Sequence, residues 1–127
     1  MNTNDRAFYE SMRFEGINTN QTFDVVLREL YAHFADQWRK GNAEAVWARR
    51  DDDPVRWQAA LAHYVAAKAW AHLYLDTSGL AKSCAVDDPR LPAITARHEA
   101  FLMEYAELNE RIGSAITDKA MADAIGE

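Results

Sequence analysis

The stretch from Trp57 to Asp76, WQAALAHYVAAKAWAHLYLD, limits what this chain can fold into more than any other segment. Almost every residue in it is alanine, aliphatic or aromatic, and the exceptions are Gln58, His63, Lys68, His72 and Asp76. A helix that is apolar on nearly every side has to be covered by several neighbours. The His and Lys interruptions argue against a membrane span, and the many alanines allow neighbouring backbones to come close. The stretch therefore predicts the buried central helix of a soluble helical bundle.

Size and composition point to one globular domain. The chain has 127 residues, which suits a single domain with one core, and we treat 1–127 as one unit. Its 49% hydrophobic content argues against disorder, and its net charge of −6 argues against a nucleic-acid binder, which would carry a basic patch. The single cysteine, Cys84, cannot form an internal disulfide, and the N-terminal residues lack a signal-peptide pattern. We therefore expect a cytoplasmic protein with no membrane contact.

The first half of the chain predicts three helices. Residues 1–16 predict a short docking helix, with Phe8 and Met12 one turn apart, that must pack on the body or on a partner. A stronger helix is expected from Thr22 to Lys40, where apolar residues recur at steps of three and four. Gly41 is expected to end this helix, and a further short helix should follow from Ala43 to Arg50.

The second half is expected to contain two helices and a long loop. Asp53 and Pro54 predict the start of the central helix as its N-cap and first residue, which explains the neighbouring aspartates better than a calcium site does. Residues 77–90 predict a loop that folds back on the bundle or contacts another chain. A last helix should run from Pro92 to Ile112, with 114–127 as a thinner continuation or a flexible tail. The predicted fold is therefore all-α, a small helical bundle of four to five helices.

No stretch of the sequence matches a catalytic, metal-binding or cofactor-binding motif. His63 and His98 both fall on apolar faces, where a lone histidine is more often a neutral core residue than a ligand or base. We therefore expect no enzyme activity, no metal and no cofactor. A small helical enzyme or metal-binding bundle built around His63 and His98 remains an alternative.

The most polar face of the predicted central helix is still half apolar, which suggests that another protein surface covers it. Four Trp and five Tyr in so short a chain favour the same conclusion, because aromatic residues are enriched in interface hot spots. The cover is either another part of the chain or a partner. The candidate interface consists of this face together with two residues of the predicted loop: Leu61, Val65, Lys68, Ala69, His72, Leu80 and Val86.

The order and character of the predicted helices carry a resemblance to a known family. An amphipathic helix is followed by the Ala- and aromatic-rich run from Ala59 to Ala67 that continues through Trp70 and Tyr74, then by a loop with Asp76 and Ser78. The closing helix carries Phe101, Tyr105, Leu108 and Ile112. Across residues 22–112 this layout resembles the head-to-tail adaptor and head-completion proteins of tailed phages.

The resemblance implies a non-enzymatic structural subunit that packs side to side in a ring under the portal. It also implies a homo-oligomer with a neighbouring assembly component as partner, no direct nucleic-acid binding, and a place in the host cytoplasm or the virion. No family site residues can be assigned to this sequence, because no short motif defines them. An alternative within binding proteins is a small phage or bacterial regulator or inhibitor that binds a host protein complex.

Overall fold

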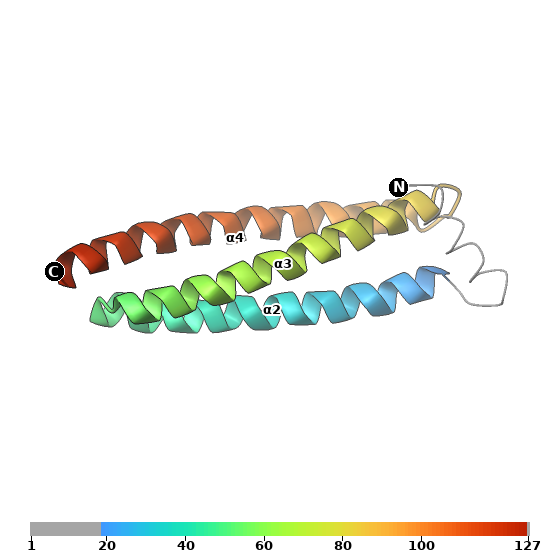
Figure 1. Cartoon of the computed structure of the whole chain (residues 1–127). Helices are drawn as coiled ribbons and strands as arrows, with labels where there is room; N and C mark the ends of the chain where they lie inside the picture. Colours follow the sequence, from blue (N-terminus) through green and yellow to red (C-terminus); the bar gives the residue numbers. More distant parts are fainter. Residues whose placement is uncertain (1–18, 127) are drawn as a thin grey trace.

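The computed structural model describes residues 19–126, which form three long helices (Figure 1). Helix α2 spans Thr19–Asp51, α3 spans Pro54–Cys84, and α4 spans Leu91–Gly126. The described residues contain no strand, so the predicted all-α class is confirmed, but the expected count of four to five helices is wrong. The docking helix predicted at 1–16 lies outside the described residues.

Gly41 does not end a helix. Helix α2 continues through it, so the segments predicted as Thr22–Lys40 and Ala43–Arg50 form one element. A Cβ placed on Gly41 would lie 2.6 Å from Cδ1 of Tyr64 and 3.3 Å from the carbonyl oxygen of Ala60, both on α3. Gly41 therefore allows close helix contact, which outweighs the cost of about 1 kcal/mol that glycine imposes on a helix.

The turn between α2 and α3 forms as the sequence predicts. The Asp53 side chain accepts hydrogen bonds from the backbone N–H groups of Val55 at 2.9 Å and Arg56 at 3.3 Å, and Pro54 opens α3. Asp52 has a φ of 47°, a left-handed conformation that Asp tolerates better than most residues. The aspartates therefore act as turn and cap.

The loop predicted over residues 77–90 is mostly helix. Helix α3 continues to Cys84, because Ser78 and Ala81 are buried and extend its contact face by another turn. Leu80 and Cys84 pack with Phe23 and Ile94 in a second apolar cluster, so this segment folds onto the bundle. Residues 114–126 continue the last helix, the first of the two alternatives expected for them, since α4 runs on to Gly126.

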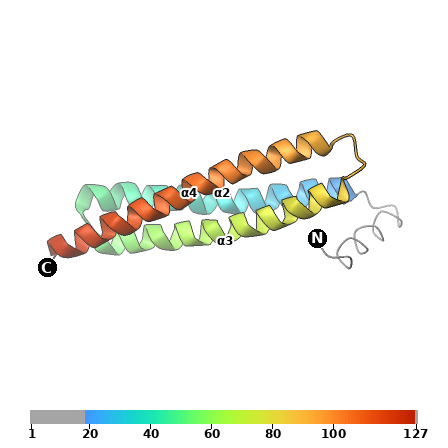
Figure 2. The ribbon, with the colours of Figure 1, turned by 90° about the horizontal axis from the view of Figure 1, so that it is seen from above.

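The spacing of buried residues explains how the helices pack. On α3 they alternate at steps of three and four: Trp57, Ala60, Tyr64, Ala67, Ala71, Tyr74, Ser78 and Ala81. On α4 they fall seven apart: Ile94, Phe101, Leu108, Ala115 and Ala122. Such heptad spacing brings helices together at small crossing angles. Helix α3 packs against both other helices, as predicted for the central element, and Figure 2 shows α4 crossing obliquely over the α2–α3 pair.

None of the described helices combines the length and the apolar character that crossing a bilayer requires.

Candidate interaction surfaces

The three helices leave one side of the bundle open. Helices α2 and α4 each pack closely on α3 but approach each other much less. The Phe34 and Phe101 rings meet across the gap with centroids 5.0 Å apart. Three polar bridges also cross it: Arg97–Asp24 at 2.9 Å, Tyr31–Glu104 at 3.2 Å and Arg49–Asp118 at 3.4 Å. We call the surface between α2 and α4, with α3 as its floor, the open groove.

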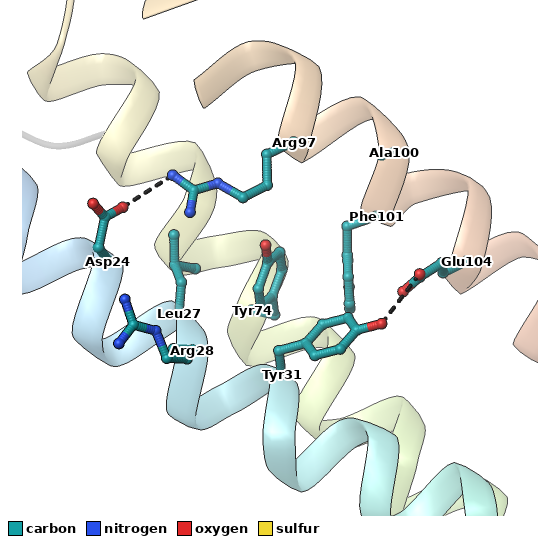
Figure 3. Close-up of a pocket in the computed structure, with 9 residues that line it drawn as sticks. All are labelled: Asp24, Leu27, Arg28, Tyr31, Tyr74, Arg97, Ala100, Phe101 and Glu104. Atoms are coloured by element: carbon teal, nitrogen blue, oxygen red, sulfur yellow. Dashed lines mark hydrogen bonds and ion pairs between the residues drawn. The ribbon is translucent and has the colours of Figure 1, made fainter. Parts of the chain in front are cut away.

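A large hollow of about 290 Å³ lies in the open groove (Figure 3). Its floor is aromatic: the Tyr74 ring stacks on Phe101 with centroids 3.9 Å apart, and Tyr31 meets both rings edge-on. Polar side chains from α2 and α4 surround these rings. The lining residues are Asp24, Leu27, Arg28, Tyr31, Tyr74, Arg97, Ala100, Phe101 and Glu104.

Several polar groups of this hollow lack partners among the described residues. Tyr74 is 4% exposed, and burial raises the pKa of its hydroxyl. Among residues 19–126, this hydroxyl has no hydrogen-bond partner. No ion pair joins Arg28 to another residue of 19–126. Burial raises the pKa of Tyr31, and the charge of Glu104 raises it further. The Tyr31 hydroxyl donates to Oε1 of Glu104, whereas Oε2 of Glu104 is buried with no partner in the part of the chain that the structure describes. An occupant could accept hydrogen bonds from Tyr74 and Arg28.

A second hollow of about 180 Å³ lies farther along the open groove. Arg49 reaches over the Trp57 ring, with its Cζ atom 5.4 Å from the centroid. The Tyr64 hydroxyl donates to Oδ1 of Asn42 at 2.6 Å. The residues that line this hollow include no acid: Asn42, Ala45, Val46, Arg49, Trp57, Tyr64, Arg111, Ser114 and Ala115. A smaller hollow of about 90 Å³ adjoins the first and shares Asp24, Leu27 and Arg97 with it.

The predicted interface residues separate into exposed and covered groups. Val65 and Val86 are each 58% exposed, and Ala69 is exposed as well. Leu61 and Leu80 are partly buried and pack on the two core clusters, so the chain itself covers them.

The polar members of the predicted interface are not both free to meet a partner. Nε2 of His72 lies 2.7 Å from the Tyr105 hydroxyl of α4, and Lys68 is half-buried. The face is therefore an exposed stripe along α3 with covered edges, and Leu80 belongs to a different cluster.

The two histidines predicted on apolar faces do not meet. Nδ1 of His63 lies 2.8 Å from Oε1 of Gln37, and Nδ1 of His98 lies 2.9 Å from the Ser78 hydroxyl. His63 and Ser78 are fifteen residues apart on α3, which corresponds to about 22 Å along a helix. Each imidazole has a separate local partner, and residues 19–126 contain no group of three or more His, Cys, Asp or Glu side chains that could hold a metal ion.

Sequence reasoning missed the open groove. Tyr31, Tyr74 and Phe101 have the spacing of ordinary core residues, and periodicity does not show whether a neighbouring helix covers them. One feature of the sequence could have indicated the open groove: arginines stand directly beside apolar core positions, as Arg28 does after Leu27 and Arg49 after Ala48.

Comparison of the chain with known protein families, with curated proteins and with solved structures gave no match. The features that bear on function are therefore the open groove and the exposed stripe of α3, and the resemblance to phage adaptor proteins remains a prediction.

Proposed function

We propose that this protein is an interaction subunit of a larger assembly and that a segment of a partner protein docks in the open groove. The observation that carries the proposal is the open side of the bundle, where α2 and α4 stay apart over an aromatic floor. Insertion of an amphipathic helix into an apolar groove is a recurrent mode of protein recognition. Such a helix would complete a four-helix arrangement.

The bridges across the open groove are weak enough to permit docking. In Arg97–Asp24 and Arg49–Asp118 every side chain is at least 36% exposed. Exposed ion pairs of this kind contribute roughly 0–1 kcal/mol each. A partner that covers the Tyr31 ring, which is 40% exposed, could therefore displace them at small cost.

The exposed stripe of α3 supports self-association. Ala62, Val65 and Ala69 are exposed between Gln58 and Asp76, and Leu73 is 49% exposed beside them. Along the stripe, steps of four, three, four and seven residues join Gln58, Ala62, Val65, Ala69 and Asp76. An antiparallel second copy therefore places Val65 opposite Ala69 and Gln58 opposite Asp76. A two-fold interface requires this self-complementarity.

Site-specific photocrosslinking tests the groove proposal. A benzoylphenylalanine at Ala100, which lines the large hollow, should form discrete protein adducts in an extract of the native cells, identified by mass spectrometry. The matched control is Met103, which is 76% exposed on the same helix but does not line the groove. Adducts that form equally at both positions, or at neither, would contradict docking in the groove.

Sedimentation equilibrium of Val65→Asp tests self-association. Because Val65 is largely exposed, the variant should keep its helicity and melting temperature while its mass falls to that of a monomer. A wild-type protein that is already monomeric at high concentration would remove the stripe from the proposal.

The narrower proposal is a head-to-tail adaptor of a tailed phage, and it predicts a closed ring visible by electron microscopy in the presence of the portal. A regulator that binds a host complex would instead dock as one or two copies and form no ring. An enzyme or metal-binding bundle would require His63 and His98 to act separately, so each His→Ala variant should then lose activity or metal by itself.

A further inference from the structure

We propose that the second hollow of the open groove binds a carboxylate that the docking partner carries, held between Arg49 of α2 and Arg111 of α4. The inference deepens the proposed function and rests on it. The site would give the groove a chemical preference, because the partner segment would need an Asp or Glu at the position that reaches this hollow.

Two guanidinium groups from opposite walls reach this hollow. Arg49 comes from α2 and Arg111 from α4, and the lining contains no acidic residue. Both cations lower the pKa of Tyr64 against the stronger effect of its burial, so both lie near the same hydroxyl. In a chain with a net charge of −6, this is a local concentration of positive charge.

The existing partners of the two arginines are weak and lie at the rim. Arg49 pairs with Asp118 at 3.4 Å, with side chains 64% and 36% exposed. Arg111 pairs with Glu107 at 3.6 Å, with side chains 49% and 56% exposed. Such long, hydrated pairs contribute little, whereas a carboxylate between two guanidiniums can form short, charge-assisted hydrogen bonds. A partner carboxylate can therefore compete with Asp118 and Glu107.

The surroundings of the arginines favour a single side chain as the ligand. Trp57 and Tyr64, each 2% exposed, form the apolar base, and the Trp57 ring supports the Arg49 guanidinium. The volume of about 180 Å³ suits one acidic side chain. When the rest of the partner covers the groove and excludes water, the attraction between the charges becomes stronger.

Titration with an octaglutamate peptide tests the site, with the indole N–H signal of Trp57 and the arginine Nε–H signals followed by NMR. Signals of Arg49, Arg111 and Trp57 should shift together. The double variant Arg49→Gln/Arg111→Gln should bind at least about tenfold more weakly, since charge-assisted pairs are the strong class of hydrogen bond. Arg39→Gln is the matched control, because Arg39 pairs with Asp36 outside the groove and its loss should change affinity less than about twofold.

Asp118→Asn supplies a test in the opposite direction. This change releases Arg49 from its present partner, so octaglutamate should bind more tightly, by about two- to fivefold for the loss of one exposed ion pair. A merely structural role for Asp118 would not increase affinity.

Three outcomes would overturn the inference: no shift with octaglutamate, equal weakening by Arg39→Gln, or binding of inorganic phosphate as tight as that of the peptide. The last result would identify a general anion site. Photocrosslinking from Ala100 keeps the two proposals separate, because adducts that persist in the double variant would leave groove docking intact while removing the carboxylate site.

Discussion

Helix α2 takes part in two contacts that differ in closeness. Toward α3 it presents Gly41, which lies against Ala60 and Tyr64 with no room for a Cβ atom. Toward α4 it presents Tyr31 and Phe34, which contact Phe101 across the gap, and a hollow remains beside Tyr31. We call the first contact the α2–α3 seam and compare it with the open groove.

The comparison shows that side-chain size, more than apolar character, separates the two contacts. Glycine and alanine let two backbones approach until their surfaces fit without voids. Rings and arginines hold helices apart, and their shapes do not fill the space that they create. A bundle can therefore be closed on one side and open on another although both sides are rich in apolar residues.

The largest expected effect follows from removing the Phe101 ring, which lies at the centre of the aromatic floor of the open groove. Phe101 is 3% exposed and touches Phe34, Tyr31 and Tyr74. Phe101→Ala should lower the free energy of unfolding by about 3–5 kcal/mol, the usual cost of truncating a buried aromatic residue. Urea denaturation followed by circular dichroism measures it, with Met103→Ala as an exposed control on the same helix. A loss below about 1 kcal/mol would mean that the floor of the groove is not part of the core.

Adding the same side chain to each contact should separate them directly. Ala60 is fully buried in the α2–α3 seam, so Ala60→Leu should lower the free energy of unfolding by about 1–3 kcal/mol through overpacking. Ala100 lines the open groove and is exposed, so Ala100→Leu should change stability by less than about 0.5 kcal/mol. Similar losses for both in a urea titration would show that the groove is as closed as the seam.

Two glycine substitutions should change stability in opposite directions. Gly113→Ala, with nothing within 4 Å of the added Cβ, should stabilise α4 by about 0.5–1 kcal/mol. Gly41→Ala gains the same helix propensity but places its Cβ 2.6 Å from the Tyr64 ring, so a net loss of about 1 kcal/mol is expected. The melting temperatures of the two variants, compared with that of the wild type, test this expectation. A stabilised Gly41→Ala variant would show that α2 and α3 are not closely packed at Gly41.

The smallest expected effect is the pH dependence contributed by the groove tyrosines. Burial raises the pKa of Tyr31 and of Tyr74 above the ordinary value of 10.0, so the folded state favours the protonated phenols. Their contribution is complete below pH 10 and is lost as pH rises through the higher folded-state values. Stability should fall in alkaline solution, and the fall should be smaller in Tyr74→Phe. An unchanged alkaline profile in Tyr74→Phe would show that the Tyr74 phenol is not held protonated by the fold.

Some features were predictable because they depend on nearby residues. The helical class, the cap at Asp53 and Pro54 and the burial of α3 follow from local periodicity and turn chemistry. The exposure of Val65 and Ala69 on an otherwise apolar helix could also be expected from the helical wheel. The covering of Leu61 and Leu80 could not, because it depends on which helix lies beside them.

The amino-acid sequence by itself determined that the described chain is helical, where α3 begins, and that α3 packs between neighbours. Only the tertiary structure decided that Gly41 is a contact and not a stop, that Gly79 and Gly113 lie inside helices, and that Tyr31, Tyr74 and Phe101 line a groove. The physical reason is that periodicity specifies the direction in which a side chain points. Whether that side chain meets close packing or an open hollow depends on the distance between two helices, which side chains from distant parts of the chain set together.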